Sequence, residues 1–110
     1  MKYIITESRL ENLVFNFLDT KLSEFETIES DYGNNDIDIQ FFVPNQKYSI
    51  MRYNNKQGTL QVSNSLVHSL SSLFLLDDIE SLDLIANYME KNFNFKITEL
   101  DYLRNYKEDF

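Results

Sequence analysis

Residues 31–42, DYGNNDIDIQFF, come closer to a known chemical motif than any other stretch, because they resemble part of a calcium-binding loop. An EF-hand loop requires oxygen donors at positions 1, 3 and 5, glycine at position 6 and a bidentate glutamate at position 12. Counted from Asp31, position 6 is Asp36 and position 12 is Phe42, so both fixed positions fail. Counted from Asn34, the early donors improve but the sixth and twelfth residues are again wrong. We therefore predict a turn leading into a strand, and no metal site.

His68 is the only histidine, and it stands among serines in a segment with helical periodicity. A serine–histidine–acid arrangement needs a strained nucleophile turn or a defined cleft, and nothing in the pattern marks one. The two glycines are too far apart to build a phosphate-binding or dinucleotide-binding loop. The eighteen acidic residues give no means of singling out an acid–base pair. We therefore expect a protein that is not an enzyme and that uses no cofactor.

The composition limits the class of protein and of partner. A chain of 110 residues with 43% hydrophobic residues fits one domain with a real core. The absence of cysteine removes disulfides and thiolate chemistry, which fits an intracellular setting. A net charge of −8 argues against direct contact with a nucleic-acid backbone. No apolar run approaches the length of a membrane span or of a signal-peptide core, so no membrane contact is expected. The longest run, LFLL at 73–76, is expected to be a fragment of the core.

Acidic residues gather in the segment 22–46, which contains no lysine or arginine. We call its six acids the acidic strip: Glu24, Glu26, Glu29, Asp31, Asp36 and Asp38. Asp36 and Asp38 fall on one face of a strand, where solvated carboxylates are expected. A solvated rim around a sheet is the favoured interpretation of the strip. The alternative is a contact surface for a basic partner, where complementary charge speeds and directs association.

Two aromatic features are candidates for partner contact. Phe42 falls on the polar face of its strand, and Met51 or Tyr53 is expected to join it there. The segment 101–110 places Tyr102, Tyr106 and Phe110 four residues apart, which predicts a short helix with one apolar stripe. Such a tail folds back on its own domain by default, and it can also dock in the groove of a neighbour. The segment is thus a candidate flexible or partner-docking tail.

Hydrophobic periodicity predicts the elements that carry these residues. Apolar residues spaced by three and four predict helices over 10–25, from about 64 to 74, and from a capping box at Asp77 and Glu80 through Asn92. The buried candidates of the last helix are Ile79, Leu82, Ile85, Ala86, Met89 and Phe93. Alternating segments predict an antiparallel meander of three to four strands: 25–32, 37–43, 47–53 and 59–63. Gly58 is suited to close the last hairpin.

These elements predict a single α+β domain over residues 1–110. An N-terminal helix precedes the meander, and the two further helices pack on one face of the sheet. The segment 95–100 alternates again and predicts a C-terminal edge strand, followed by the short tail helix.

Four segments stand out together: KYIITES before a leucine-rich helix, the FFV strand, the hairpin YNNKQGTLQVS, and SLFLLDDIESL before the last helix. In these segments the chain resembles small uncharacterised proteins encoded by large tailed bacteriophages of the marine type. The likeness covers most of residues 1–93 as an order of elements. It departs at Arg9, where related proteins carry glutamine, and in SNSLVHSL, which lacks an expected aromatic. The resemblance implies a phage-like origin and transfers no functional residue.

The leading hypothesis is a non-enzymatic phage accessory protein that acts by protein–protein contact, as a virion or assembly component. It would reside in the host bacterial cytoplasm or in the phage particle, and would bind a phage structural protein or a host protein. Self-association into a homo-oligomer is an additional hypothesis. The alternative is an acidic inhibitor, or decoy, of a host nucleic-acid-handling protein, favoured if the acids form one continuous face. An enzyme of unknown type is a third hypothesis, for which the sequence offers no specific residue.

Overall fold

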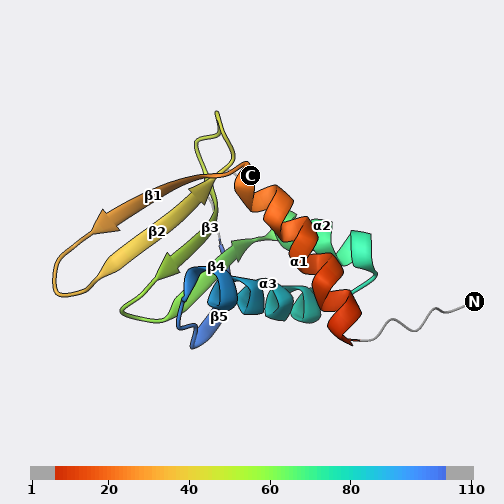
Figure 1. Ribbon diagram of the computed structural model, residues 1–110. Coiled ribbons are helices and arrows are strands. Elements are labelled where there is room, and N and C mark those ends of the chain that lie inside the picture. The colour runs from red at the N-terminus through yellow and green to blue at the C-terminus, as the bar shows by residue number, and fades with distance from the viewer. Residues whose placement is uncertain (1–6, 104–110) are drawn as a thin grey trace, which may run out of the picture.

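The computed structural model describes residues 7–103, with side chains from Arg9 onward. Three helices lie on one side of a five-stranded sheet (Figure 1). The elements in chain order are α1 (Glu7–Ser23), β1 (Glu26–Asp31), β2 (Ile37–Phe42), β3 (Ser49–Asn54), β4 (Thr59–Ser63), α2 (Asn64–Phe74), α3 (Asp78–Phe93) and β5 (Glu99–Leu103). The predicted α+β class, the meander and the packing of the helices against the sheet are therefore confirmed. None of the described helices is long and apolar enough to cross a membrane.

The strands follow the order β1-β2-β3-β4-β5 across the sheet. The first four pair antiparallel as consecutive hairpins, as the sequence predicts. β5 pairs with β4 in parallel, because α2 and α3 carry the chain back across the sheet before β5 begins. The sheet is thus mixed, with β1 and β5 at its two edges.

The core lies between the helices and one face of the sheet. Its fully buried side chains include Phe41, Met51 and Leu60 from the strands. The prediction that Met51 or Tyr53 joins Phe42 on the polar face is wrong, because both are buried on the helix side at 0% and 4% exposure. The register explains the difference, since Met51 pairs with Phe41 and a bulge separates Phe41 from Phe42.

The third helix begins as predicted, with a capping box. The Asp77 carboxylate accepts a hydrogen bond from the Glu80 backbone, and the Glu80 side chain accepts one from the Asp77 backbone. Its predicted apolar face is buried through most of its length, but Ile79 is 73% exposed and Phe93 41% exposed. The prediction that Ile79 is buried is wrong because this residue lies in the first turn of α3, before the buried residues of the helix begin at Ser81.

The last strand is β5, Glu99–Leu103, so it begins four residues later than the predicted segment 95–100 and extends beyond its end. The intervening segment is held by Phe95, whose ring stacks on Tyr53 at 3.9 Å between centroids. The Tyr53 hydroxyl also donates to the Lys96 carbonyl and accepts from the Lys96 backbone amide. The predicted tail helix is wrong for residues 101–103, which belong to β5. The rest of that segment, including Tyr106 and Phe110, lies outside the described residues.

Candidate functional site

The face of the sheet that points away from the helices is polar, and we call it the open face. Alternation along β2 and β3 places Asp38, Arg52 and Asn54 on it, because Phe41, Met51 and Tyr53 occupy the opposite face. The register sets Asp38 opposite Asn54, and Arg52 opposite Gln61 of β4. Polar side chains from three consecutive strands are thus brought side by side.

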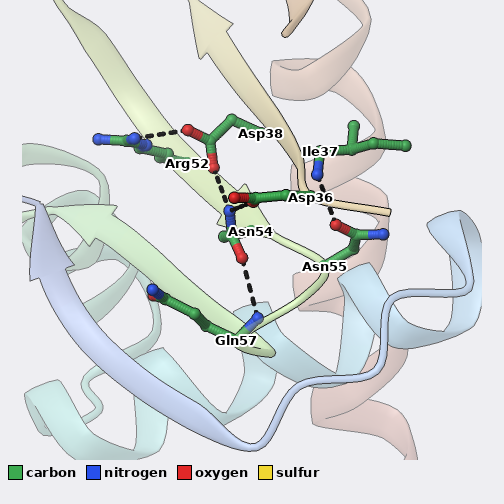
Figure 2. A network of polar contacts seen from close by, with 7 residues as sticks. All are labelled: Asp36, Ile37, Asp38, Arg52, Asn54, Asn55 and Gln57. Carbon is green, nitrogen blue, oxygen red and sulfur yellow. Dashed lines mark hydrogen bonds and ion pairs between the residues drawn. The ribbon is translucent and has the colours of Figure 1, made fainter. Parts of the chain in front are cut away.

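A network of hydrogen bonds joins these side chains (Figure 2). Arg52 Nη2 lies 2.6 Å from Asp38 Oδ2, in a salt bridge. The Asn54 side-chain amide donates to Asp38 Oδ1 at 2.6 Å and to Asp36 Oδ1 at 2.8 Å. Asn54 Oδ1 in turn accepts from the backbone amide of Gln57 at 2.9 Å. The network therefore ties the start of β2 to β3 and to the turn that follows β3.

Asp38 is the charged centre of this network and is only 2% exposed. The expectation that both Asp36 and Asp38 are solvated is therefore wrong for Asp38, because Arg52 and Asn54 enclose its carboxylate. Burial by itself raises the pKa of Asp38, but hydrogen bonds from Asn54 and Arg52, together with the Arg52 charge, outweigh it and lower the pKa below its usual value. Asp38 is thus an ionised, fully engaged carboxylate.

A cavity of about 480 Å³ opens on this network. Besides the four network side chains, it is lined by Tyr32, Gln57, Thr59 and Gln61. Tyr32 and Gln57 come from the two turns, whereas Thr59 and Gln61 belong to β4. The sequence interpretation missed this cavity, because it depends on cross-strand register rather than on any local motif.

The stretch 31–42 forms the turn and strand that the sequence predicts. Tyr32 and Asp36 close the turn, with the Tyr32 amide 2.8 Å from the Asp36 carbonyl. Gly33, Asn34 and Asn35 all adopt positive φ angles within it. Among residues 7–103, no group of three histidine or acidic side chains is gathered as a metal ion would require.

The acidic strip does not form one continuous surface. Glu24, Glu26, Glu29 and Asp31 are exposed, but Glu29 and Asp31 point to the opposite side of β1 from Glu26. The remaining two acids, Asp36 and Asp38, belong to the network. The strip is therefore divided between the two faces of β1 and the cavity.

The two described aromatic candidates differ in their surroundings. Phe42 is half-buried on the open face, paired across the strands with Glu26. Tyr102 is half-buried on the helix side, where it packs against the core. Burial, and next the negative charge of Asp78, raise the pKa of Tyr102. Tyr102 thus contributes to the core of the protein as well as to its surface.

Exposed apolar side chains gather where α2 turns into α3, and we call this region the α2–α3 corner. Leu73, Leu75 and Ile79 are 61%, 91% and 73% exposed. Leu75 is the C-cap of α2 and adopts the left-handed conformation, with φ 55° and its amide bonded to the Ser71 carbonyl. The sequence interpretation missed the corner because it counted Leu73 and Ile79 as core. The signal that could have revealed it is the unbroken run LFLL directly before the acidic capping box.

His68 is exposed on α2, where it lines a shallow groove with Phe17 and Lys21 of α1. This groove lies on the helix side of the sheet, whereas the buried carboxylate of Asp38 lies on the open face. The structure therefore does not bring His68 and Asp38 together.

No protein-family model matches the chain, and no match is found among curated proteins or among solved structures.

Proposed function

We propose that this chain acts by binding another protein through the α2–α3 corner, as a non-enzymatic accessory protein of a tailed bacteriophage. The observation that carries the proposal is the exposure of Leu73, Leu75 and Ile79 within seven consecutive residues. Isolated exposed apolar side chains are ordinary, but a local group rimmed by polar residues is typical of a binding surface.

The conformation of Leu75 supports this proposal. A helix that ends in the left-handed conformation normally has glycine or asparagine at that position, because a branched side chain is strained there by about 1–3 kcal/mol. Leu75 adopts this strained conformation although it is 91% exposed to solvent. Packing of its side chain within the chain therefore contributes little stabilisation to offset the strain. A binding role gives a physical reason for a leucine at this position.

Charge indicates the kind of partner. Asp77, Asp78 and Glu80 are exposed and lie between or beside the apolar side chains of the corner. A second copy of the chain would bring its own acids against these, and the net charge of −8 per chain adds to the repulsion. The surface instead fits a different protein that presents an apolar patch with basic residues around it.

The phage assignment rests on the resemblance of the order of elements and of segments such as SLFLLDDIESL, which contains the corner. It predicts a partner among phage structural proteins or host proteins. A role as a virion component predicts that purified phage particles contain the protein, and mass spectrometry of such particles tests this. Repeated absence of the protein from the particles would contradict that role.

The decisive experiment compares Leu75→Gly with Ile28→Ser in affinity capture from infected cells. We expect Leu75→Gly to lose the partner that the wild-type chain captures, yet to stabilise the fold by about 0.5–1 kcal/mol because glycine relieves the strained cap. Ile28, which is 54% exposed on β1, is a matched control for the loss of an exposed apolar side chain. Capture by both variants at the wild-type level would overturn the proposal.

The alternative of an acidic decoy is favoured by one observation on the open face. Strand alternation and register place four acids there: Glu26, Asp38, Glu99 and Asp101. Asp36 joins them through its hydrogen bond with Asn54, and Arg52 is already paired with Asp38. Binding of a basic protein to this face should weaken steeply as salt concentration rises, whereas binding through the corner should depend little on salt. Measuring the affinity of the captured partner against ionic strength distinguishes the two.

A further inference from the structure

We propose that the cavity on the open face is a binding site for a neutral polyhydroxylated ligand, that is, a saccharide. This site lies on the opposite side of the sheet from the helices, and it is independent of the protein-binding role of the α2–α3 corner. Its volume of about 480 Å³ falls within the ~300–1,000 Å³ typical of small-molecule sites.

The floor of the cavity is rigid. Asp38 is held from two sides by Arg52 and Asn54, and the Asn54 side chain is held in turn by Asp36 and by the Gln57 amide. The Asp38 carboxylate and the Asn54 carboxamide are therefore fixed before any ligand arrives, which lowers the entropy lost on binding. Figure 2 shows these side chains gathered across β2, β3 and the following turn.

The walls carry unused hydrogen-bonding groups. The side chains of Gln57, Thr59 and Gln61 line the cavity, and they make no hydrogen bond to any of the described residues. A carboxamide offers two donors and one acceptor oxygen, and a hydroxyl both donates and accepts. The side chain of Arg52 is 42% exposed, and a single nitrogen, Nη2, forms its salt bridge. Together these groups supply both the donors and the acceptors that the hydroxyls of a sugar require.

Charge and polarity disfavour the other ligand classes. Two carboxylates against one guanidinium repel phosphate and other anions. A cation gains little, because Asp38 is already neutralised by Arg52 and both of its oxygens are hydrogen-bonded. An apolar ligand would leave the carboxamides unpaired. At the rim, Tyr32 is 62% exposed and can lie against the C–H face of a sugar ring.

The test is titration of the ¹⁵N-labelled chain with D-glucose, D-galactose, D-mannose and N-acetyl-D-glucosamine, and with maltotetraose and chitotetraose, each to tens of millimolar. We expect the side-chain amide signals of Asn54, Gln57 and Gln61 to move saturably with at least one of these probes. Tighter binding of a tetrasaccharide than of its monosaccharide would indicate a glycan chain as the source, and equal binding a free sugar.

Two variants and one control make the test specific. Gln61→Ala should weaken binding about tenfold, as loss of one to two hydrogen bonds implies, and Tyr32→Ala should weaken it as well. Gln40→Ala is the control, because Gln40 lies on the same face of β2 but does not line the cavity. No saturable shift with any saccharide would overturn the proposal. Binding of the saccharide by all three variants with the wild-type affinity would overturn it as well. L-Arginine amide and inorganic phosphate are titrated in parallel, and shifts caused only by these two charged probes would also overturn it.

Discussion

The β1–β2 and β3–β4 hairpins are built from similar parts but occupy different surroundings. Each is an antiparallel pair closed by a turn rich in asparagine and containing one glycine. Residues of β1 are exposed along almost its whole length, whereas β3 alternates buried and half-buried residues. Figure 1 shows the reason, since the β1–β2 hairpin projects beyond the helices. β1, with five polar residues among the six of ETIESD, therefore lies outside the core, whereas β2 of the same hairpin still buries Phe41.

The two turns differ in the same way. At Gly33, with φ 86°, an added Cβ would meet no atom within 4 Å. At Gly58, with φ 69°, a Cβ would lie 2.6 Å from Thr98 Oγ1 and 3.2 Å from the Lys96 carbonyl oxygen. The Gly58 carbonyl also accepts hydrogen bonds from the amides of Thr98 and Glu99. The β3–β4 turn therefore holds the start of β5 through hydrogen bonds and close contacts at Gly58.

The largest expected contrast between the hairpins is in their apolar side chains. Leu60 of β4 is fully buried, so Leu60→Ala should lower the free energy of unfolding by about 2–5 kcal/mol through lost burial and a residual cavity. Ile28→Ala on β1 should change it by less than about 0.5–1 kcal/mol, because Ile28 is 54% exposed. Urea unfolding of both variants measures the difference. Equal losses would show that β1 is packed more tightly than its exposure indicates.

The second contrast uses the glycines. Gly58→Ala should destabilise the fold by about 2–3 kcal/mol, because it combines a left-handed backbone with contacts to Thr98 and Lys96. Gly33→Ala should lose only about 1 kcal/mol, from the backbone strain alone. Thermal unfolding of the pair tests this. A loss at Gly33 as large as that at Gly58 would contradict the attachment of β5 to the second turn.

The third prediction concerns the network that joins the two hairpins. Asp38→Ala should lower stability by about 1–3 kcal/mol, because Asn54 and Arg52 lose charged hydrogen-bond partners in a nearly dry position. Asp36→Ala, which removes one hydrogen bond from a half-buried carboxylate, should have a smaller effect. Chemical unfolding in low salt measures the loss of stability in both variants. A larger loss for Asp36→Ala would mean that Asp36, and not Asp38, is the main stabilising carboxylate of the network.

The smallest expected effect is on pH dependence. The folded-state pKa of Asp38 is lowered, so ionised Asp38 stabilises the fold above its unfolded pKa of about 3.9. This contribution is lost as the pH falls through the lowered folded-state pKa. The stability difference between the wild-type chain and Asp38→Asn should therefore be constant near neutral pH and shrink below about pH 4. A difference that stays unchanged down to pH 2 would mean that the Asp38 charge contributes nothing.

Periodicity predicts the order and type of the elements well, because most helices and strands here have one clear apolar face. The capping box at Asp77 and the turn at Gly58 are also predictable, since they depend on residues close together in the chain. The same periodicity wrongly assigns Leu73 and Ile79 to the core, because a helical stripe shows which face is apolar but not how far the neighbouring elements extend along it.

The candidate site is harder to predict than the fold. The burial of Asp38 depends on the register that brings Arg52 and Asn54 beside it from β3, and alternation within one strand carries no information about register. The position of β5 depends on the stacking of Phe95 on Tyr53, a contact between residues far apart in the sequence. Both features are set by tertiary pairing, so only the structure reveals them.

The parallel pairing of β5 has a consequence for how the protein reaches its native state. Each of its partners on β4 is distant in the chain, as in the pair of Thr59 with Glu99. Closing so large a loop is slow, whereas the consecutive hairpins form from local contacts. During synthesis, the edge of β4 that faces away from β3 should therefore stay open until β5, which follows both helices, has emerged from the ribosome. In that interval, the open edge of β4 offers its backbone hydrogen-bonding groups to other chains and thus favours aggregation.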